Sequence, residues 1–119
     1  SWQFQQLLSP LFFGARNEMA YLVCMDGKSK LLACRKIGEG VASAVDITSR
    51  KVVEEALSCN AVRVALAHNH VSGIAAYSAA DVASTRQLSR ILAAVDIKLV
   101  DHFILAGDDM VSMRDSGVL

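Results

Sequence analysis

Two histidines one residue apart, followed by a serine and an aspartate, form the stretch of this chain best suited to chemistry. His68 and His70 flank Asn69, Ser78 lies eight residues after the second histidine, and Asp81 lies three residues further on. In extended backbone, residues i and i+2 point to the same side, so the two imidazoles can converge. Imidazole nitrogen is a good zinc ligand. The spacing therefore suggests a metal site, although two histidines in a loop are also common as unrelated surface or capping groups.

Asp81 is the candidate third ligand. If Ser72-Gly73 turns the chain back, the first turn of the following helix lies beside the histidines and its carboxylate faces them. Alternatively, Asp81 only caps its own helix, where the helix dipole favours an anion. Two histidines and one carboxylate leave a zinc position open for water, as catalytic sites do. Zinc lowers the pKa of that water to about 7, which is the requirement for hydrolysis at neutral pH.

Such a hydrolysis also needs a general base and a donor to the developing oxyanion. Ser78 is close enough in sequence to be the donor, and it is equally well placed to be the N-cap of the helix. Glu18 is the best candidate base, because it opens an otherwise apolar strand where a charge is uncomfortable without a role or access to solvent. His102 follows Asp101 in a late strand. That pair could form a supporting network, but we do not count His102 as a ligand.

The elements that must position these groups follow from hydrophobic periodicity and turn residues. The histidines come directly after a short apolar strand, and ligand sites collect at the carboxyl ends of strands in sheets that carry helices on their faces. The full set of predicted elements, in chain order, is a helix over 2–13 with Pro10 as a kink or early end, strands over 18–25 and 30–37 joined by a turn at 26–29, a break at Gly38-Glu39-Gly40, a short strand over 41–45, a helix from Thr48 to a left-handed Asn60, a strand over 62–67, a helix from Ser78 to about Val95, and strands over 97–106 and 110–113. The sum is a mixed α/β domain of about three layers.

Composition narrows the class of protein further. The 119 residues suffice for one domain with its own core, and 53% of them are hydrophobic. Lys plus Arg balance Asp plus Glu at 12 each, so there is no basic excess of the kind that duplex-binding domains usually show. The three cysteines form no Cys-x-x-Cys pair, which argues against a cysteine zinc site and for small buried side chains in a reducing compartment. No signal peptide or membrane-spanning run is visible, so we expect a cytoplasmic protein.

The chemical stretch resembles a known metalloprotease signature. An upstream Glu18, His68-Asn69-His70, Ser78 and Asp81 look like the JAMM motif of the JAB/MPN family. Within it, the chain is most similar to the bacterial RadC-like proteins, through the His-Asn-His-x-Ser-Gly segment and the Asp101-His102-Phe103-Ile104 strand. The chain departs from the family pattern in two places. Val71 stands where the family usually has a proline, and the loop 74–77 contains no proline.

The resemblance implies a JAB/MPN (cytidine deaminase-like) fold: a three-layer mixed sheet with flanking helices. It implies Zn²⁺ on His68, His70 and Asp81, Glu18 as general acid and base, and Ser78 as stabiliser of the tetrahedral intermediate. The implied reaction is hydrolysis of a peptide or isopeptide bond with metal-bound water as nucleophile. Family members usually carry an upstream helical region, so we expect residues 1–119 to be a single RadC-like JAB/MPN domain, a fragment without that region.

The expected partner is therefore a peptide or protein substrate of unknown identity. We expect no membrane and no direct nucleic-acid binding by this domain, and self-association stays open. The alternative function is a non-catalytic protein-binding or DNA-repair-associated module that keeps the JAB/MPN fold, because neither a fold nor a family name establishes an activity.

Overall fold

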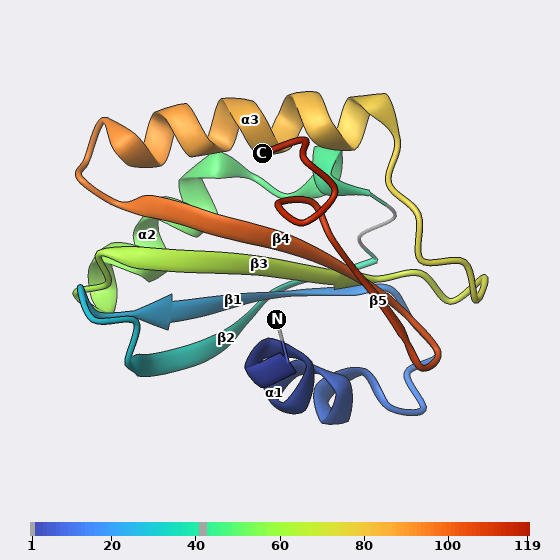
Figure 1. The fold of residues 1–119 in the computed structure, drawn as a ribbon. Helices are drawn as coiled ribbons and strands as arrows, with labels where there is room; N and C mark the ends of the chain where they lie inside the picture. The colour runs from blue at the N-terminus through green and yellow to red at the C-terminus, as the bar shows by residue number, and fades with distance from the viewer. Residues whose placement is uncertain (1, 41–42) are drawn as a thin grey trace.

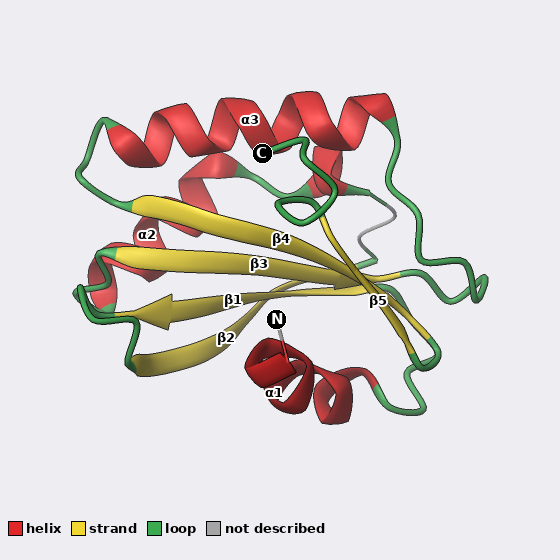
Figure 2. Cartoon of the chain, in the orientation of Figure 1, coloured by secondary structure: helices red, strands yellow, loops and turns green. Residues whose placement is uncertain are grey.

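A computed structural model describes residues 2–40 and 43–119 of the chain, and shows a central sheet with helices on both sides (Figures 1 and 2). Its elements, in chain order, are α1 (Trp2–Phe12), β1 (Met19–Met25), β2 (Leu31–Glu39), the 3₁₀ helix η1 (Ala44–Asp46), α2 (Ser49–Ser58), β3 (Arg63–Asn69), α3 (Ala79–Ala93), β4 (Lys98–Ala106) and β5 (Asp109–Ser112). None of the helices described is long and apolar enough to cross a membrane.

The sheet is mixed, with the strand order β2-β1-β3-β4-β5. Strand β1 pairs antiparallel with both β2 and β3, and β5 pairs antiparallel with β4. Strands β3 and β4 run parallel, which requires a long crossover connection, and α3 provides it. The carboxyl ends of β3 and β4 therefore lie at the same edge of the sheet, where the histidine segment begins.

Alternation along the strands divides the apolar side chains between two cores. On one face, Leu22, Val64 and Leu66 pack with residues of α2 and α3, such as Val52 and Leu92. On the other face, side chains one position along each strand pack against Leu8 and Phe12 of α1; they are Val23, Met25, Ala65, Ala67, Phe103 and Leu105. The three layers are therefore α1, the sheet, and the α2–α3 pair, as predicted from the sequence.

Local signals explain where the helices begin and end. The Thr48 side chain accepts a hydrogen bond from the Lys51 amide as the N-cap of α2, and Asn60 follows that helix with a φ of 56°, the left-handed conformation expected for it. Helix α1 contains Pro10 and ends only two residues later. Gly14, with a φ of 68°, then redirects the chain.

Three details differ from the sequence-based prediction. Strand β2 continues through Gly38 and Glu39, which pair with the first residues of β1, so these residues do not break it. The strand predicted over 41–45 falls partly outside the described residues, and Ala44–Asp46 form η1. The helix predicted to run to about Val95 ends at Ala93, and Val95 is 42% exposed.

Candidate metal centre

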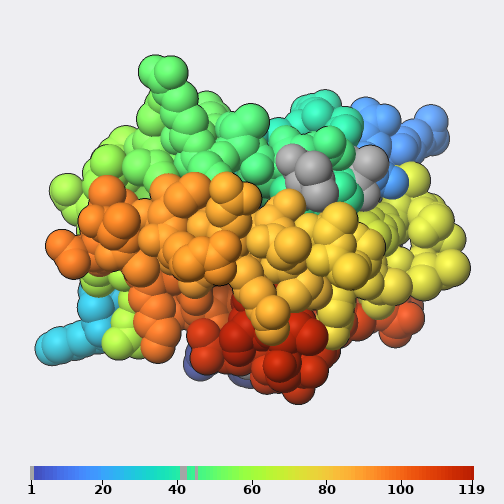
Figure 3. Space-filling model, turned by 90° about the horizontal axis from the view of Figure 1, so that it is seen from above, coloured from blue at the N-terminus to red at the C-terminus, as the bar shows by residue number. Residues whose placement is uncertain are grey.

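His68 faces the α2–α3 side of the sheet from the end of β3. It continues the series Val64, Leu66 and His68, in which alternate residues share a face. Its side chain is completely buried. Figure 3 looks onto this side of the molecule: the residues of α3, coloured yellow to orange, run across it, and the yellow 71–78 segment lies at one end. The imidazole is therefore buried between the sheet and the α2–α3 layer, in contact with His70 and His102.

The structure brings the two predicted histidine ligands together. The Nε2 atoms of His68 and His70 lie 3.1 Å apart. Two nitrogens that share a tetrahedral zinc, each at 2.0–2.1 Å, are separated by about 3.3 Å, so the pair fits one shared metal ion. His70 is oriented by its Nδ1, which lies 3.2 Å from the carbonyl oxygen of Ile74. Because the partner is a backbone carbonyl, the loop 74–77 can orient the His70 ring even though it contains no proline.

Asp81 and Ser78 form a capping box at the start of α3, as the sequence predicted. The Ser78 hydroxyl oxygen accepts the Asp81 amide hydrogen at 3.0 Å, and Asp81 Oδ2 accepts the Ser78 amide hydrogen at 2.8 Å. The other carboxylate oxygen, Oδ1, accepts a hydrogen bond from the Ala44 amide at 2.8 Å, which ties η1 to α3. Asp81 is only 2% exposed. Its carboxylate thus has a structural role at the helix start and across to η1.

His70, Ser78 and Asp81 nevertheless line one open hollow of about 410 Å³. The loop 72–77 forms the rest of its wall, with Ser43 beside η1. No group of three His, Cys, Asp or Glu side chains stands at metal-binding distances in the part of the chain that the structure describes. The structure therefore assembles the histidine pair and keeps the carboxylate at the rim of the same hollow. Each Asp81 oxygen uses one lone pair for its amide hydrogen bond and retains a second, so the donor set remains chemically suited to zinc.

Glu18 lies immediately before β1, and Asn69 holds the backbone on both sides of it. Asn69 Oδ1 accepts the Met19 amide hydrogen at 2.7 Å, and its Nδ2 donates to the Asn17 carbonyl at 3.2 Å. The β1–β3 pairing ends at Ala20 and His68, so Glu18 and His70 each lie two residues beyond it, and Glu18 is not among the residues that line the hollow. The glutamate side chain is half-buried. Sequence reasoning could not assign Asn69 this role, because the contact joins residues 50 positions apart.

His102, which sequence reasoning left out of the ligand set, lies directly behind His68. Its Nε2 is 2.7 Å from His68 Nδ1, and its Nδ1 is 2.9 Å from the Thr85 hydroxyl of α3. All three side chains are at most 1% exposed. The neighbouring Asp101 does not orient this ring: its carboxylate accepts hydrogen bonds from the Ser112 hydroxyl and from backbone amides.

Burial keeps both inner histidines neutral. It lowers the pKa of His68 to about 4, the nearby His70 acts in the same direction, and the Asp81 carboxylate partly opposes the shift. Burial, and then His68, lower the pKa of His102 well below its ordinary value. Neutral imidazole is the form that binds metal, so at pH 7 His68 needs no deprotonation to act as a ligand.

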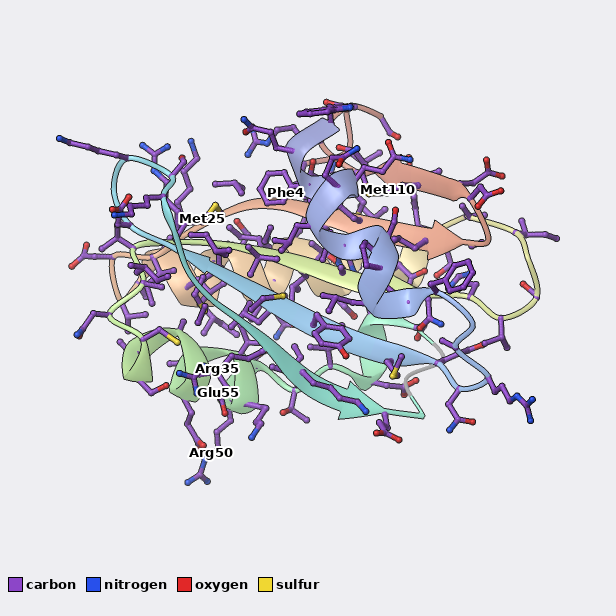
Figure 4. The ribbon with its side chains drawn as sticks, turned by 90° about the horizontal axis from the view of Figure 1, so that it is seen from below. Phe4, Met25, Arg35, Arg50, Glu55 and Met110 are labelled. Atoms are coloured by element: carbon purple, nitrogen blue, oxygen red, sulfur yellow. The ribbon has the colours of Figure 1, made fainter. Side chains whose placement is uncertain are left out.

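A larger hollow, of about 550 Å³, lies on the opposite face of the sheet beside α1. Figure 4 shows this face from below, with α1 crossing the strands and Phe4 and Met25 on it. The hollow is lined by apolar and by polar or charged side chains in equal number, and no histidine is among them. It is larger than the hollow beside His70, but none of the predicted site residues lines it.

Comparison with known proteins identifies a family and several relatives. The family model described as RadC-like JAB domain matches residues 1–118. The UPF0758 protein of Bordetella parapertussis is 45% identical over 95 residues, which cover 80% of this chain and 42% of that protein. The UPF0758 protein of a Janthinobacterium species is 36% identical over 115 residues, which cover 97% of this chain and 51% of that protein. The UPF0758 protein of Photobacterium profundum is 37% identical over 112 residues, which cover 94% of this chain and 50% of that protein. The chain thus spans about half the length of the curated relatives it matches.

Proposed function

The chain belongs to the RadC-like JAB domain family, and from this premise we propose that it is a zinc-dependent hydrolase that cleaves a peptide or isopeptide bond. His68, His70 and Asp81 would hold the metal. When bound, zinc would supply a Lewis acid that polarises the scissile carbonyl and acidifies a water molecule. The observation that carries the proposal is the 3.1 Å approach of the two Nε2 atoms beside a hollow that Asp81 and Ser78 also line.

Ser78 supports this proposal through the way it caps α3. Its Oγ accepts the Asp81 amide hydrogen with a lone pair, so its own hydroxyl hydrogen is not used by the cap. Ser78 also lines the hollow. The same residue can therefore cap the helix and donate a hydrogen bond to a developing oxyanion, and these two roles need not compete.

The fixed backbone around Glu18 also supports the proposed function. The segment that carries Glu18 is fixed by Asn69 on β3 and by the Gly40 amide, which donates to the Glu18 carbonyl at 2.7 Å. A carboxylate on a fixed backbone at this edge of the sheet would accept a proton from a water molecule and return it to the leaving amine. The role assigned to Glu18 is that of general acid and base.

The first test is metal content, measured by mass spectrometry on protein purified without chelator and without a His-tag. We expect about one zinc per wild-type chain, the stoichiometry of a single site, and none in the His68→Ala/His70→Ala variant. Gln87→Ala/Arg90→Ala, on the exposed side of α3, is the matched control and should bind like wild type. A wild-type chain that stays metal-free in the presence of added zinc would refute the proposal.

The second test measures zinc binding and peptide cleavage in the same variants. Glu18→Gln should keep zinc and abolish cleavage in a mixed peptide library, whereas Ser78→Ala should keep zinc and slow cleavage by roughly 10²–10³-fold, the usual loss for one oxyanion donor. Unaltered turnover of Glu18→Gln would remove Glu18 from the mechanism.

One observation favours the second candidate function, a non-catalytic module that keeps the fold. Both Asp81 oxygens already accept backbone amide hydrogens: the Ala44 contact holds η1 to α3, and the Ser78 contact caps α3, without any metal. In that case a metal-free wild-type chain would fold and bind its protein partner normally, and the metal measurement above distinguishes the two functions.

A further inference from the structure

We propose that His102 and Thr85 are positioning residues for the metal centre, and that metal binding reverses the two hydrogen bonds that run from Thr85 through His102 to His68 and replaces the one between His68 and His70. The inference rests on the proposed function, because it concerns the same metal. It assigns a role to two buried polar side chains that the proposed reaction does not otherwise use.

In the metal-free protein, the donor and acceptor in each of these hydrogen bonds follow from the contact between His70 and the Ile74 carbonyl. The Ile74 carbonyl can only accept, so His70 Nδ1 carries its hydrogen, and in the neutral ring Nε2 is then an acceptor. His68 Nε2 must therefore donate to it, which leaves His68 Nδ1 as an acceptor. By the same logic His102 Nε2 donates to His68, and the Thr85 hydroxyl donates to His102 Nδ1.

A metal ion on His68 Nε2 demands the opposite arrangement. That nitrogen must offer its lone pair, so the ring hydrogen moves to Nδ1 and is donated to His102 Nε2. His102 then carries its hydrogen on Nδ1 and donates it to the Thr85 oxygen. Each imidazole keeps one hydrogen and stays neutral, so the reversal changes no net charge inside the protein. The Thr85 hydroxyl hydrogen can turn to the carbonyl one helical turn earlier, as threonines in helices do.

Because these side chains are buried, each of their nitrogens needs a hydrogen-bond partner inside the protein, with or without the metal. His68, His102 and Thr85 are at most 1% exposed, so bulk water cannot satisfy a nitrogen that loses its partner. Histidine and threonine can each donate or accept at the same atom, and this allows both directions in one geometry. An apolar residue at either position would leave a buried nitrogen unpaired and would free the His68 ring to rotate.

The test measures zinc affinity by competition with a chromophoric chelator. Thr85→Val and His102→Phe should weaken zinc binding by about 10–100-fold, the usual effect of removing a partner of a ligating histidine. Thr85→Ser restores the hydroxyl and should restore the affinity. Thr48→Val is the matched control, because it removes an exposed N-cap hydroxyl and destabilises the fold without touching the metal centre. Because His102→Phe exchanges a buried ring, Thr85→Val decides the question if that variant does not fold.

Nitrogen NMR of the histidine rings supplies a readout that a purely structural role would not change. On addition of zinc, the hydrogen of His102 should move from Nε2 to Nδ1, and that of His68 from Nε2 to Nδ1. Zinc binding with unchanged affinity in Thr85→Val and His102→Phe, or with no change of tautomer, would overturn this inference and leave the proposed function standing. A wild-type chain that binds no zinc would overturn both.

Discussion

Removal of the Asp81 carboxylate should destabilise the metal-free protein substantially. An aspartate that served only as a ligand could be replaced by alanine with little effect on the fold. Here the carboxylate accepts hydrogen bonds from the Ala44 and Ser78 amides and is 2% exposed. Asp81→Ala leaves both donors without their acceptor.

The magnitude follows from the surroundings of the two donors. Ala44 is only 5% exposed, so its amide loses a charge-assisted hydrogen bond with no water to replace it, which costs about 2–3 kcal/mol. Ser78 lines the open hollow, where water can reach its amide, so the loss there is about 1 kcal/mol, the usual value of a helix cap. We expect Asp81→Ala to lower the free energy of unfolding by about 3–4 kcal/mol, and Asp81→Asn, which keeps one acceptor oxygen, by roughly half of that.

Urea unfolding followed by far-ultraviolet circular dichroism is the suitable assay, at pH 7 with a chelator present so that lost metal binding does not contribute. Asp108→Ala, in the exposed turn between β4 and β5, is the control for loss of a carboxylate and should stay within about 0.5 kcal/mol of wild type. A loss below about 1 kcal/mol for Asp81→Ala would show that the Ala44 and Ser78 contacts contribute little to stability, and that the carboxylate is available mainly to a metal.

Three further predictions follow. In the metal-free protein, the native pKa of about 4 for His68 lies below the unfolded value, so as the pH falls from about 6.5 to 4 the unfolded chain binds more protons and His68 alone lowers stability by roughly 3 kcal/mol. His102, whose pKa burial also lowers, adds to this fall, so His68→Gln should lessen the fall in urea titrations at pH 7 and 4.5 without abolishing it. Asn69→Ala should cost about 1–3 kcal/mol and speed hydrogen exchange at the Met19 amide, whose bond it removes; unchanged exchange there would contradict the role given to Asn69. Leu92→Ala should lower the unfolding free energy by about 2–5 kcal/mol, and the same change at Leu57, which is 53% exposed, by much less in the same assay.

Local patterns accounted for most of the fold. The strand before the histidines, the left-handed Asn60 and the capping box of Ser78 and Asp81 depend on neighbouring residues, so the sequence was sufficient to predict them. The family resemblance was confirmed over nearly the whole chain. The assignment of Glu18, Ser78 and the three ligands to catalytic and metal-binding roles stays a prediction, because those roles require a metal and a substrate.

What the sequence could not reveal depends on contacts across the sheet. In the β3–β4 register Val64 pairs with Leu99 but Ala65 pairs with Asp101, so Val100 is an extra residue in β4. Strict alternation from Leu99 would direct His102 away from α3. The extra residue places His102 on the same face as Leu66, its partner on β3, and so next to His68. A one-residue irregularity of this kind leaves no reliable signal in the amino-acid pattern.

The parallel pairing of β3 and β4 also bears on the order in which the molecule folds. The β1–β2 hairpin joins near neighbours and can form early, whereas β3 and β4 meet only after α3 has closed a long loop between them. His68 and His102 are 34 residues apart and come together through that late pairing. We therefore expect the metal centre to be absent from the folding transition state, so that substitutions in it accelerate unfolding far more than they slow folding. A bound zinc ion would then lengthen the lifetime of the native protein by retarding its unfolding.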